Sequence, residues 1–259
     1  MKVAILAGGH GVRFGVETQL RPKALIDVAG KPILRRVMEI YSAQGLKDFV
    51  IALGYRGEDI KRYFFETMWL EGNVAIDMAA RSVRSHPDHC GDWNISLIDT
   101  GIHTATGTRL AKLAPHIDGD CFMLTWCDGL ADINLASLLS FHRAHGRIAT
   151  LTAVNRPGRF GEISMENDAV TRFDEKPLRR RKWINGAFFV LNRGIFEYLD
   201  GPHVDWETEV LPRLVATRQL MGYRHAGFWQ CMDTSQDRDE LVELLFRGKG
   251  PGICGGHTQ

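Results

Sequence analysis

The 259-residue sequence is poor in cysteine, and its five cysteines form no regular pattern. They are odd in number and scattered, and they are Cys90, Cys121, Cys127, Cys231 and Cys254. None of them forms a C-x-x-C pair, so the pattern argues against both a disulfide framework and a zinc site. We therefore expect a protein that works in a reducing cytoplasm.

An excess of one charge and a long apolar segment are also missing. The 32 basic and 31 acidic side chains give a formal net charge of +1, so no global field attracts nucleic acid or a membrane. No apolar run approaches the roughly 18 residues that cross a bilayer, and no signal-like segment precedes the first strand-like residues. We expect neither a nucleic-acid nor a membrane partner, and local cations must hold any anionic ligand.

Two well-known phosphate motifs are incomplete in this chain. A dinucleotide fingerprint would need a third glycine where Phe14 stands, and no acidic residue follows the second expected strand, residues 49–53, to hold a ribose hydroxyl. A P-loop ends in Gly-Lys-Ser/Thr, but Gly30 and Lys31 precede Pro32. The sequence thus opposes a dinucleotide-dependent oxidoreductase and a P-loop enzyme.

The chain does open on an apolar strand, residues 3–6, that runs into a loop with three glycines over residues 8–11. Glycine has no Cβ and adopts positive φ readily, so the N–H groups of such a loop can approach a polyphosphate closely. Arg13 and, after a stiffening proline, Lys23 supply cations nearby. The loop predicts a nucleotide site, while a merely tight strand-to-helix turn stays the alternative.

Strand-like and helix-like segments alternate along the chain. Strands are expected near 3–6, 48–53, 74–79, 95–99, 121–125, 148–154, 161–165, 169–174, 183–191 and 220–226, and helices near 31–45, 56–68, 134–145, from 206 and from 235. Such alternation implies crossover units. It predicts an α/β fold with a Rossmann-like, mostly parallel mixed sheet, flanking helices and small β additions. We expect one domain over residues 1–248 and a C-terminal tail over residues 249–259.

Two polar segments fit no periodic element. Residues 80–93 have the polarity of an exposed loop, which we regard as a candidate intersubunit element. Two interpretations of this segment stay open: a metal held by His86, His89 and Cys90, or a solvated loop without a ligand. The basic run 179–182 is either a solvated turn or a grip on a phosphate or an acidic partner.

Carboxylates follow two of the expected strands. Asp128 ends a buried strand and Asp233 precedes a helix-like stretch. Ligands of open α/β sheets lie beyond the carboxyl ends of strands, so Asp128 should share a rim with the glycine loop. Mg²⁺ bound to a nucleoside triphosphate needs only one or two protein carboxylates. The pair predicts a magnesium site, although each aspartate alone would serve as a turn residue or a helix cap.

Taken together, these residues resemble the sugar-1-phosphate nucleotidylyltransferases. The resemblance covers residues 1 to about 248 and is carried by Leu6–Arg13, Arg21–Lys23, Gly30–Leu34, Leu97–Gly101, Pro157–Gly161, Glu175–Pro177, Trp183–Leu191 and Gly227–Thr234. The segments 157–161 and 227–230 point to the cytidylyl branch. Val12 departs from the usual threonine, and Arg21 stands where a lysine is common.

The resemblance implies a fold of the nucleotide-diphospho-sugar transferase type and transfer of CMP from CTP to α-D-glucose 1-phosphate, with release of pyrophosphate. It implies Mg²⁺ as the cofactor, held by Asp128 and Asp233. CTP and a sugar 1-phosphate would be the partners, and the chain would form a homo-oligomer such as a hexamer. Base choice comes from the resemblance alone.

The resemblance also implies roles for individual residues. It places Arg13, Lys23 and Lys176 in catalysis, with Lys176 on the sugar phosphate. Nucleotide contacts would come from Leu6, Ala7, Gly8, Gly9, Gly11, Val12 and Arg109, with Gly107 nearby, and sugar contacts from Glu175, Lys176, Asn185 and Gly186. A different sugar or polyol phosphate as acceptor, or a non-catalytic nucleotide-binding relative, stays open.

Overall fold

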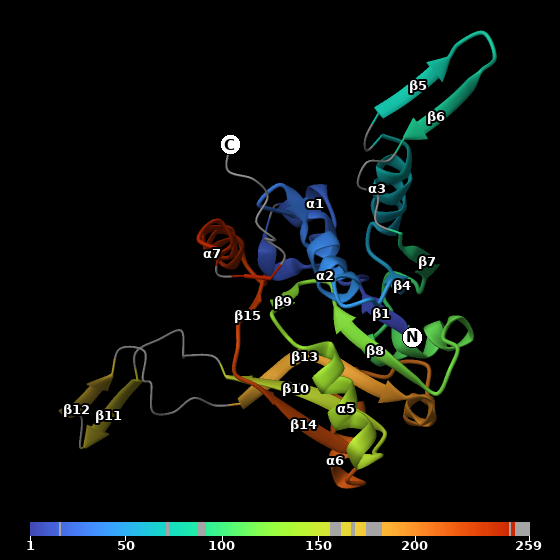
Figure 1. Cartoon of the computed structure of the whole chain (residues 1–259). Coiled ribbons are helices and arrows are strands. Elements are labelled where there is room, and N and C mark those ends of the chain that lie inside the picture. The colour runs from blue at the N-terminus through green and yellow to red at the C-terminus, as the bar shows by residue number, and fades with distance from the viewer. Residues whose placement is uncertain are drawn as a thin grey trace.

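The computed structural model describes residues 1–15, 17–70, 73–86, 92–155, 162–166, 169–174, 183–248 and 250–251, with the main chain alone for residues 84–86 and 162–174. Within these residues the chain forms an α/β structure around one large sheet (Figure 1). Several sequence predictions fall outside the described residues, namely those on the motif 157–161, the basic run 179–182, His89, Cys90 and most of the tail.

The large sheet has seven strands in the order β14-β10-β13-β8-β1-β4-β7. The strands are β1 (Lys2–Leu6), β4 (Asp48–Leu53), β7 (Asn94–Asp99), β8 (Cys121–Trp126), β10 (Ala149–Asn155), β13 (Trp183–Asn192) and β14 (Leu220–His225). β13 runs antiparallel to β8 and β10, and the other four pairings are parallel. The predicted mostly parallel mixed sheet is confirmed.

Helices cover both faces of the sheet, because strand side chains alternate in direction. Val3 and Ile5 of β1 join one apolar cluster, whereas Ala4 and Leu6 join the other. The first cluster includes side chains of α2 (Ile33–Ser42), α3 (Gly57–Leu70), α5 (Leu135–His145) and α7 (Ser235–Phe246), and the second those of α4 (Thr106–Leu113) and α6 (Leu211–Ala216). Among the described residues, no helix combines the length and the apolar character that a membrane span requires.

Short elements complete the chain. They are the helix α1 (Glu17–Leu20), the 3-10 turns η1 (Val12–Phe14), η2 (Lys23–Leu25), η3 (Ala114–His116) and η4 (Arg193–Tyr198), and the π-helical segment η5 (Trp206–Val210). The predicted small β additions are two-stranded: β2 (Asp27–Val28) with β3 (Lys31–Pro32), β5 (Asn73–Asp77) with β6 (Ser82–His86), β9 (Gly129–Ala131) with β15 (Trp229–Cys231), and β11 (Glu162–Glu166) with β12 (Ala169–Asp174).

Two local predictions differ from the structure. The loop expected over residues 80–93 contains β6, which pairs with β5 in a hairpin that projects from the body (Figure 1). The side chains of β5 are exposed, so the hairpin lacks the apolar alternation that reveals a half-buried strand. The helix α4 was not expected, because it begins with Thr-Gly-Thr, and it is stabilised instead by burial of Leu110 and Leu113.

Candidate active site

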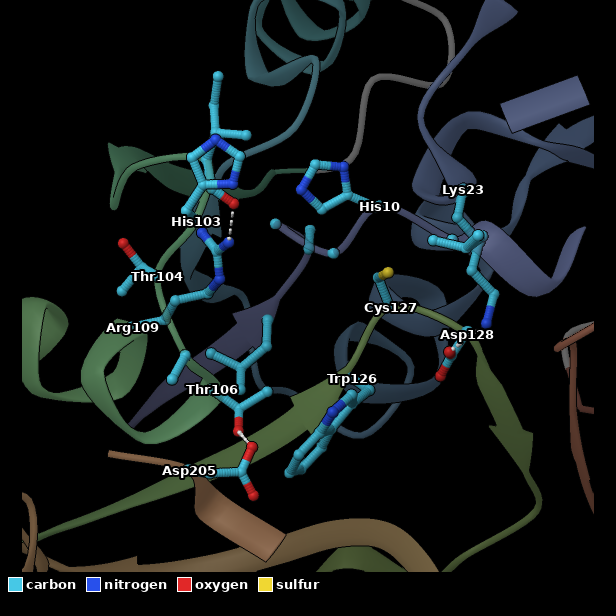
Figure 2. A pocket seen from close by; sticks show the side chains of 18 of the residues that line it. His10, Lys23, His103, Thr104, Thr106, Arg109, Trp126, Cys127, Asp128 and Asp205 are labelled. Atoms are coloured by element: carbon cyan, nitrogen blue, oxygen red, sulfur yellow. Dashed lines mark hydrogen bonds and ion pairs between the residues drawn. The ribbon is translucent and has the colours of Figure 1, made fainter. Parts of the chain in front are cut away.

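A cavity of about 610 Å³ opens at the carboxyl ends of the parallel strands (Figure 2). Its walls come from the loop after β1, from residues 102–106 between β7 and α4, from residues 126–128 at the end of β8, and from three residues of the C-terminal part: His203, Asp205 and Asp233. This is the edge of the sheet at which open α/β folds bind their ligands.

The glycine loop forms one wall of this cavity. All six of its predicted nucleotide-binding residues line the wall: Leu6, Ala7, Gly8, Gly9, Gly11 and Val12. Gly11 is left-handed with φ of 62°, and a Cβ there would lie 3.1 Å from Cβ of Lys23. Thr18 and buried Phe14 hold the far side of the loop, since the Thr18 hydroxyl donates to the carbonyl of Gly15 at 2.9 Å. The local conformation therefore requires glycine at position 11.

Lys23 connects the glycine loop to the two predicted carboxylates. Its Nζ donates to Oδ2 of Asp128 at 2.7 Å and to Oδ1 of Asp233 at 2.8 Å. Nη1 of Arg13 lies 3.4 Å from Oδ2 of Asp233, on a side chain that is 81% exposed. Four residues that the sequence placed in one site are thus brought together.

The carboxylates determine the charge state of Lys23. Burial alone would lower the pKa of the ammonium group, but attraction and hydrogen bonds from Asp128 and Asp233 outweigh burial and raise the pKa well above its usual value. Lys23 is therefore a permanent cation in this structure. A fixed cation beside a glycine loop can oppose the charge of a polyphosphate.

A small antiparallel ladder brings the two aspartates together. β9 pairs with β15 so that Gly129 faces Cys231, and the N–H of Met232 donates to the carbonyl of Asp128 at 2.8 Å. Beyond β15, the carboxylate of buried Asp237 accepts from the N–H of Asp233 at 3.1 Å. The ladder and the first turn of α7 therefore fix the main chain on both sides of the site.

The donor set suits a hard cation. Asp128 and Asp233 converge on one nitrogen, and two carboxylates are what a magnesium ion usually takes from a protein when phosphates and water complete its shell. Within the described part of the chain, no group of three or more His, Cys, Asp or Glu side chains could hold a metal. The pair thus fits Mg²⁺ bound together with a nucleotide.

Arg109 borders the same cavity, but its hydrogen-bond partners differ in kind from those of Lys23. Only 4% of the residue is exposed, and its guanidinium donates to the carbonyls of Leu53, Gly101 and Ile102 and to the Thr100 hydroxyl at 2.7–3.1 Å. Its contacts indicate that Arg109 holds the loop after β7 against the end of β4. The nucleotide contact that the resemblance implies for it stays a prediction.

The position of Arg109 explains why some of the glycines around it are required, which the sequence alone does not show. A Cβ on Gly8 or on Gly54 would lie 2.3 or 2.4 Å from Nη1 of Arg109, a distance that atoms cannot adopt. Gly9, in contrast, has no atom of the described residues within 4 Å of such a Cβ. Gly8 is thus required by its contact with Arg109, whereas no contact within the described residues requires Gly9.

Asn185 and Gly186, the predicted acceptor residues within the described part of the chain, do not line this cavity. The side-chain oxygen of Asn185 accepts from the N–H of Ala187 at 2.8 Å, and the carbonyl of Gly186 accepts from Nε1 of Trp229 at 2.8 Å. The second contact places Gly186 beside Trp229 of β15. Glu175 and Lys176 lie outside the described residues.

Sequence reasoning missed several residues of the cavity wall. His10 stacks on Tyr55 and on His103, with ring centroids 4.8 and 5.8 Å apart. Trp126 and Asp205 line the side away from Lys23 (Figure 2). His10 could have been noticed within the glycine loop, but no motif marks the other residues.

The chain is similar over almost its whole length to known proteins. The family model described as Nucleotidyl transferase matches residues 2–236. The glucose-1-phosphate cytidylyltransferase of Salmonella typhi is 42% identical over 252 residues, which cover 97% of this chain and 98% of that protein. A probable glucose-1-phosphate cytidylyltransferase of Bacillus subtilis (strain 168) is 37% identical over 253 residues, or 96% and 98% of the two chains.

Solved structures agree in fold. HddC from Yersinia pseudotuberculosis superposes with a TM-score of 0.71 at 19% identity, covering 94% of this chain and 99% of that one. The inositol-1-phosphate CTP transferase from T. maritima gives a TM-score of 0.66 at 15% identity and covers 98% of both chains. At these identities the likeness concerns the fold alone.

Proposed function

The chain belongs to the nucleotidyl transferase family, and on that premise we propose that it is a glucose-1-phosphate cytidylyltransferase. It transfers CMP from CTP to α-D-glucose 1-phosphate, yielding CDP-glucose and pyrophosphate. The substrates rest on the near-full-length similarity to enzymes of that name. The observation that supports the reaction class is the meeting of Lys23 with Asp128 and Asp233 beside the glycine loop.

The reaction needs no covalent intermediate on the protein. A phosphate oxygen of glucose 1-phosphate attacks the α-phosphorus of CTP, a new P–O bond forms, and the bond to the β-phosphate breaks as pyrophosphate leaves. The catalytic task is to align the two anions and to offset their repulsion. Lys23 and Arg13 supply fixed positive charge at the wall where the phosphates would lie.

The glycine loop would hold the triphosphate through main-chain N–H groups, which Val12 provides as well as a threonine would. Asp128 and Asp233 would hold Mg²⁺. When bound, this ion supplies charge neutralisation and orientation of the phosphates. Because both carboxylates contact Lys23 in the ligand-free chain, the ammonium group already lies where positive charge is required.

For the acceptor, we assign Lys176 to the sugar phosphate and Glu175, Asn185 and Gly186 to the sugar. The support is positional: Gly186, which follows Asn185 in β13, contacts Trp229 of β15, and β15 leads directly to Asp233. A sugar on that side would face the carboxylate pair from the end opposite the nucleoside.

The deciding experiment measures magnesium-dependent pyrophosphate release with CTP, UTP, dTTP, ATP and GTP, each against glucose 1-phosphate and other sugar or polyol phosphates. Release with CTP and glucose 1-phosphate, abolished by EDTA and restored by Mg²⁺, is expected. Release with CTP and another acceptor would move the chain to a sister specificity. No release with any pair would favour a nucleotide-binding relative without catalysis.

We further assign the hairpin β5–β6 to contacts between copies of the chain. Ile76 is 63% and Met78 is 83% exposed, and Phe65 and Leu70 at the end of α3 are exposed next to them. A two-stranded hairpin with exposed apolar side chains is only marginally stable in water, so a partner surface is expected to cover it. Light scattering should report a homo-oligomer, for which the resemblance suggests a hexamer, and Ile76→Asp should dissociate it. A monomeric wild-type protein would overturn this assignment.

A further inference from the structure

Asp205 lines the cavity at the end away from Lys23, and its two carboxylate oxygens have different partners. Oδ1 accepts from the N–H and from the hydroxyl of Thr208, both at 2.8 Å, and so caps η5. Oδ2 accepts from the hydroxyl of Thr106 at 3.3 Å, and the main-chain N–H of Glu207 also interacts with the carboxylate. One oxygen therefore supports the fold, while the other faces the first turn of α4.

The hydroxyl of Thr106 cannot satisfy Oδ2 fully. It accepts from the N–H of Trp206 at 2.9 Å and has a single proton to donate. Two carboxylates compete for that proton, and Glu207 is the nearer, with Oε2 at 3.1 Å against 3.3 Å for Asp205. Oδ2 of Asp205 thus keeps the capacity to accept a hydrogen bond from a ligand.

The charge of Asp205 restricts what that ligand group can be. Burial works against the charged form, but the hydrogen bonds from Thr208 and Thr106 hold the pKa of the carboxyl below its usual value, so it is ionised at neutral pH. An anion repels phosphates, which belong with Lys23 on the other side of the cavity (Figure 2). Oδ2 is suited to a neutral donor on the nucleoside.

The neighbouring Trp126 makes this end suitable for a flat ring. Its indole packs against Phe189 with centroids 5.5 Å apart, and Phe189 in turn packs edge-on against buried Trp206. The indole is therefore held in place beside the cavity, where a base could stack on it.

We propose that Asp205 selects the nucleotide base, with Oδ2 accepting a hydrogen bond from the exocyclic amino group of cytosine. This inference rests on the proposed function, which makes CTP the substrate. Uracil and thymine carry an oxygen acceptor where cytosine carries that amino group. The same carboxylate would therefore attract CTP and repel UTP or dTTP, so one side chain supplies both halves of the discrimination.

Asp205→Asn separates the two roles of the side chain. Asparagine caps helices as well as aspartate does, and the cap requires its amide oxygen to stay on Thr208. The amide nitrogen then replaces Oδ2 and presents a donor to the base. Steady-state kinetics should show the kcat/KM ratio of CTP to UTP falling about 10-fold or more. Glu207→Gln, which alters the other carboxylate on Thr106 outside the cavity, should leave the ratio unchanged.

An unchanged CTP to UTP ratio of kcat/KM in a folded, active Asp205→Asn protein would overturn the proposal. If that variant also shows a reduced preference for CTP over dCTP, the carboxylate would be assigned to a ribose hydroxyl. If the asparagine variant does not fold, Asp205→Ser retains a good cap and takes its place.

Failure of the proposed function would look different. A wild-type protein that releases no pyrophosphate with CTP would refute the proposed reaction, whatever Asp205 does. In that case calorimetric binding of CTP and of UTP to wild type and Asp205→Asn still tests base selection. Tighter binding of CTP than of UTP that the variant loses would support it, and equal binding to the wild type would contradict it.

Discussion

Lys23 and Arg109 are cations on the wall of one cavity, yet they are held by opposite kinds of partner. Lys23 lies between two carboxylates that could exchange it for other positive charge. Arg109 donates to carbonyls and a hydroxyl that need a donor whether or not a ligand is present. A cation paired with movable charges can serve chemistry, whereas a cation bonded to the main chain serves architecture. The residue type alone does not show which of these two roles a cation has.

The largest effect is expected for Lys23→Ala, which removes the fixed cation from the phosphate wall. Turnover should fall roughly 10²–10³-fold, as for loss of a preorganised electrostatic contact. The free energy of unfolding should change little, because Asp128 and Asp233 are both partly exposed and their carboxylates can be solvated by water. Pyrophosphate release and urea denaturation measure the two quantities.

Lys31→Ala is the matched control for Lys23→Ala. Lys31 also binds a carboxylate, Glu39, at 2.7 Å, but it does not line the cavity. Its loss should leave turnover unchanged. Near-normal turnover of Lys23→Ala would show that Lys23 has no role in the active site.

For Arg109→Ala the expected loss is in stability. The substitution leaves several buried oxygens without a donor, so the free energy of unfolding should fall by on the order of 3 kcal/mol in urea denaturation. Arg13→Ala removes an exposed arginine from the same wall and should reduce turnover without a comparable loss of stability. An Arg109→Ala protein as stable as the wild type would contradict the comparison.

Two adjacent glycines sharpen the contrast. Gly8→Ala places a methyl group against the guanidinium of Arg109 and should destabilise the protein by about 1–3 kcal/mol. Gly9→Ala meets nothing within 4 Å and should leave thermal stability unchanged while weakening CTP binding. Equal melting temperatures for the two variants would show that Arg109 does not dictate the glycine at position 8.

The smallest effect concerns a polar cluster outside the cavity. Buried His142 bonds Thr150 at 2.8 Å and Asn192 at 3.0 Å. Burial holds its pKa below the ordinary value of 6.5, so the unfolded chain takes up a proton before the folded chain does. The free energy of unfolding should therefore fall as pH drops below about 6.5, by at most about 1.4 kcal/mol per pH unit. Denaturation at several pH values tests this, with His142→Gln as the control that should reduce the slope; neighbouring His145, whose pKa is also lowered by burial, contributes the part that stays.

Local patterns were enough to predict the sheet and one side of the site. The apolar run of β1 and the helical period of α2 depend on neighbours in sequence, so both elements were expected where they lie. Asp128 and Asp233 were expected together because each follows a strand at one edge of a sheet. That reasoning uses the topology of the fold and no side-chain detail.

The rest depends on contacts that sequence spacing does not encode. The carbonyls that surround Arg109 come from the ends of β4 and β7, and Asp205 reaches Thr106 across 99 residues. The strand β5 was expected near residues 74–79, but β6 was missed because its sequence lacks the apolar alternation of a half-buried strand. Each of these features follows from tertiary packing, which a pattern of residue types cannot show.

The ladder between β9 and β15 also orders events during synthesis. Lys23 meets one carboxylate 105 residues later and the other 210 residues later. A nascent chain that ends before Trp229 carries the glycine loop, Lys23 and Asp128, but lacks the strand that positions Asp233. Under the proposed function, the site is therefore complete only after β15 has been synthesised, and we expect shorter chains to leave CTP unconsumed.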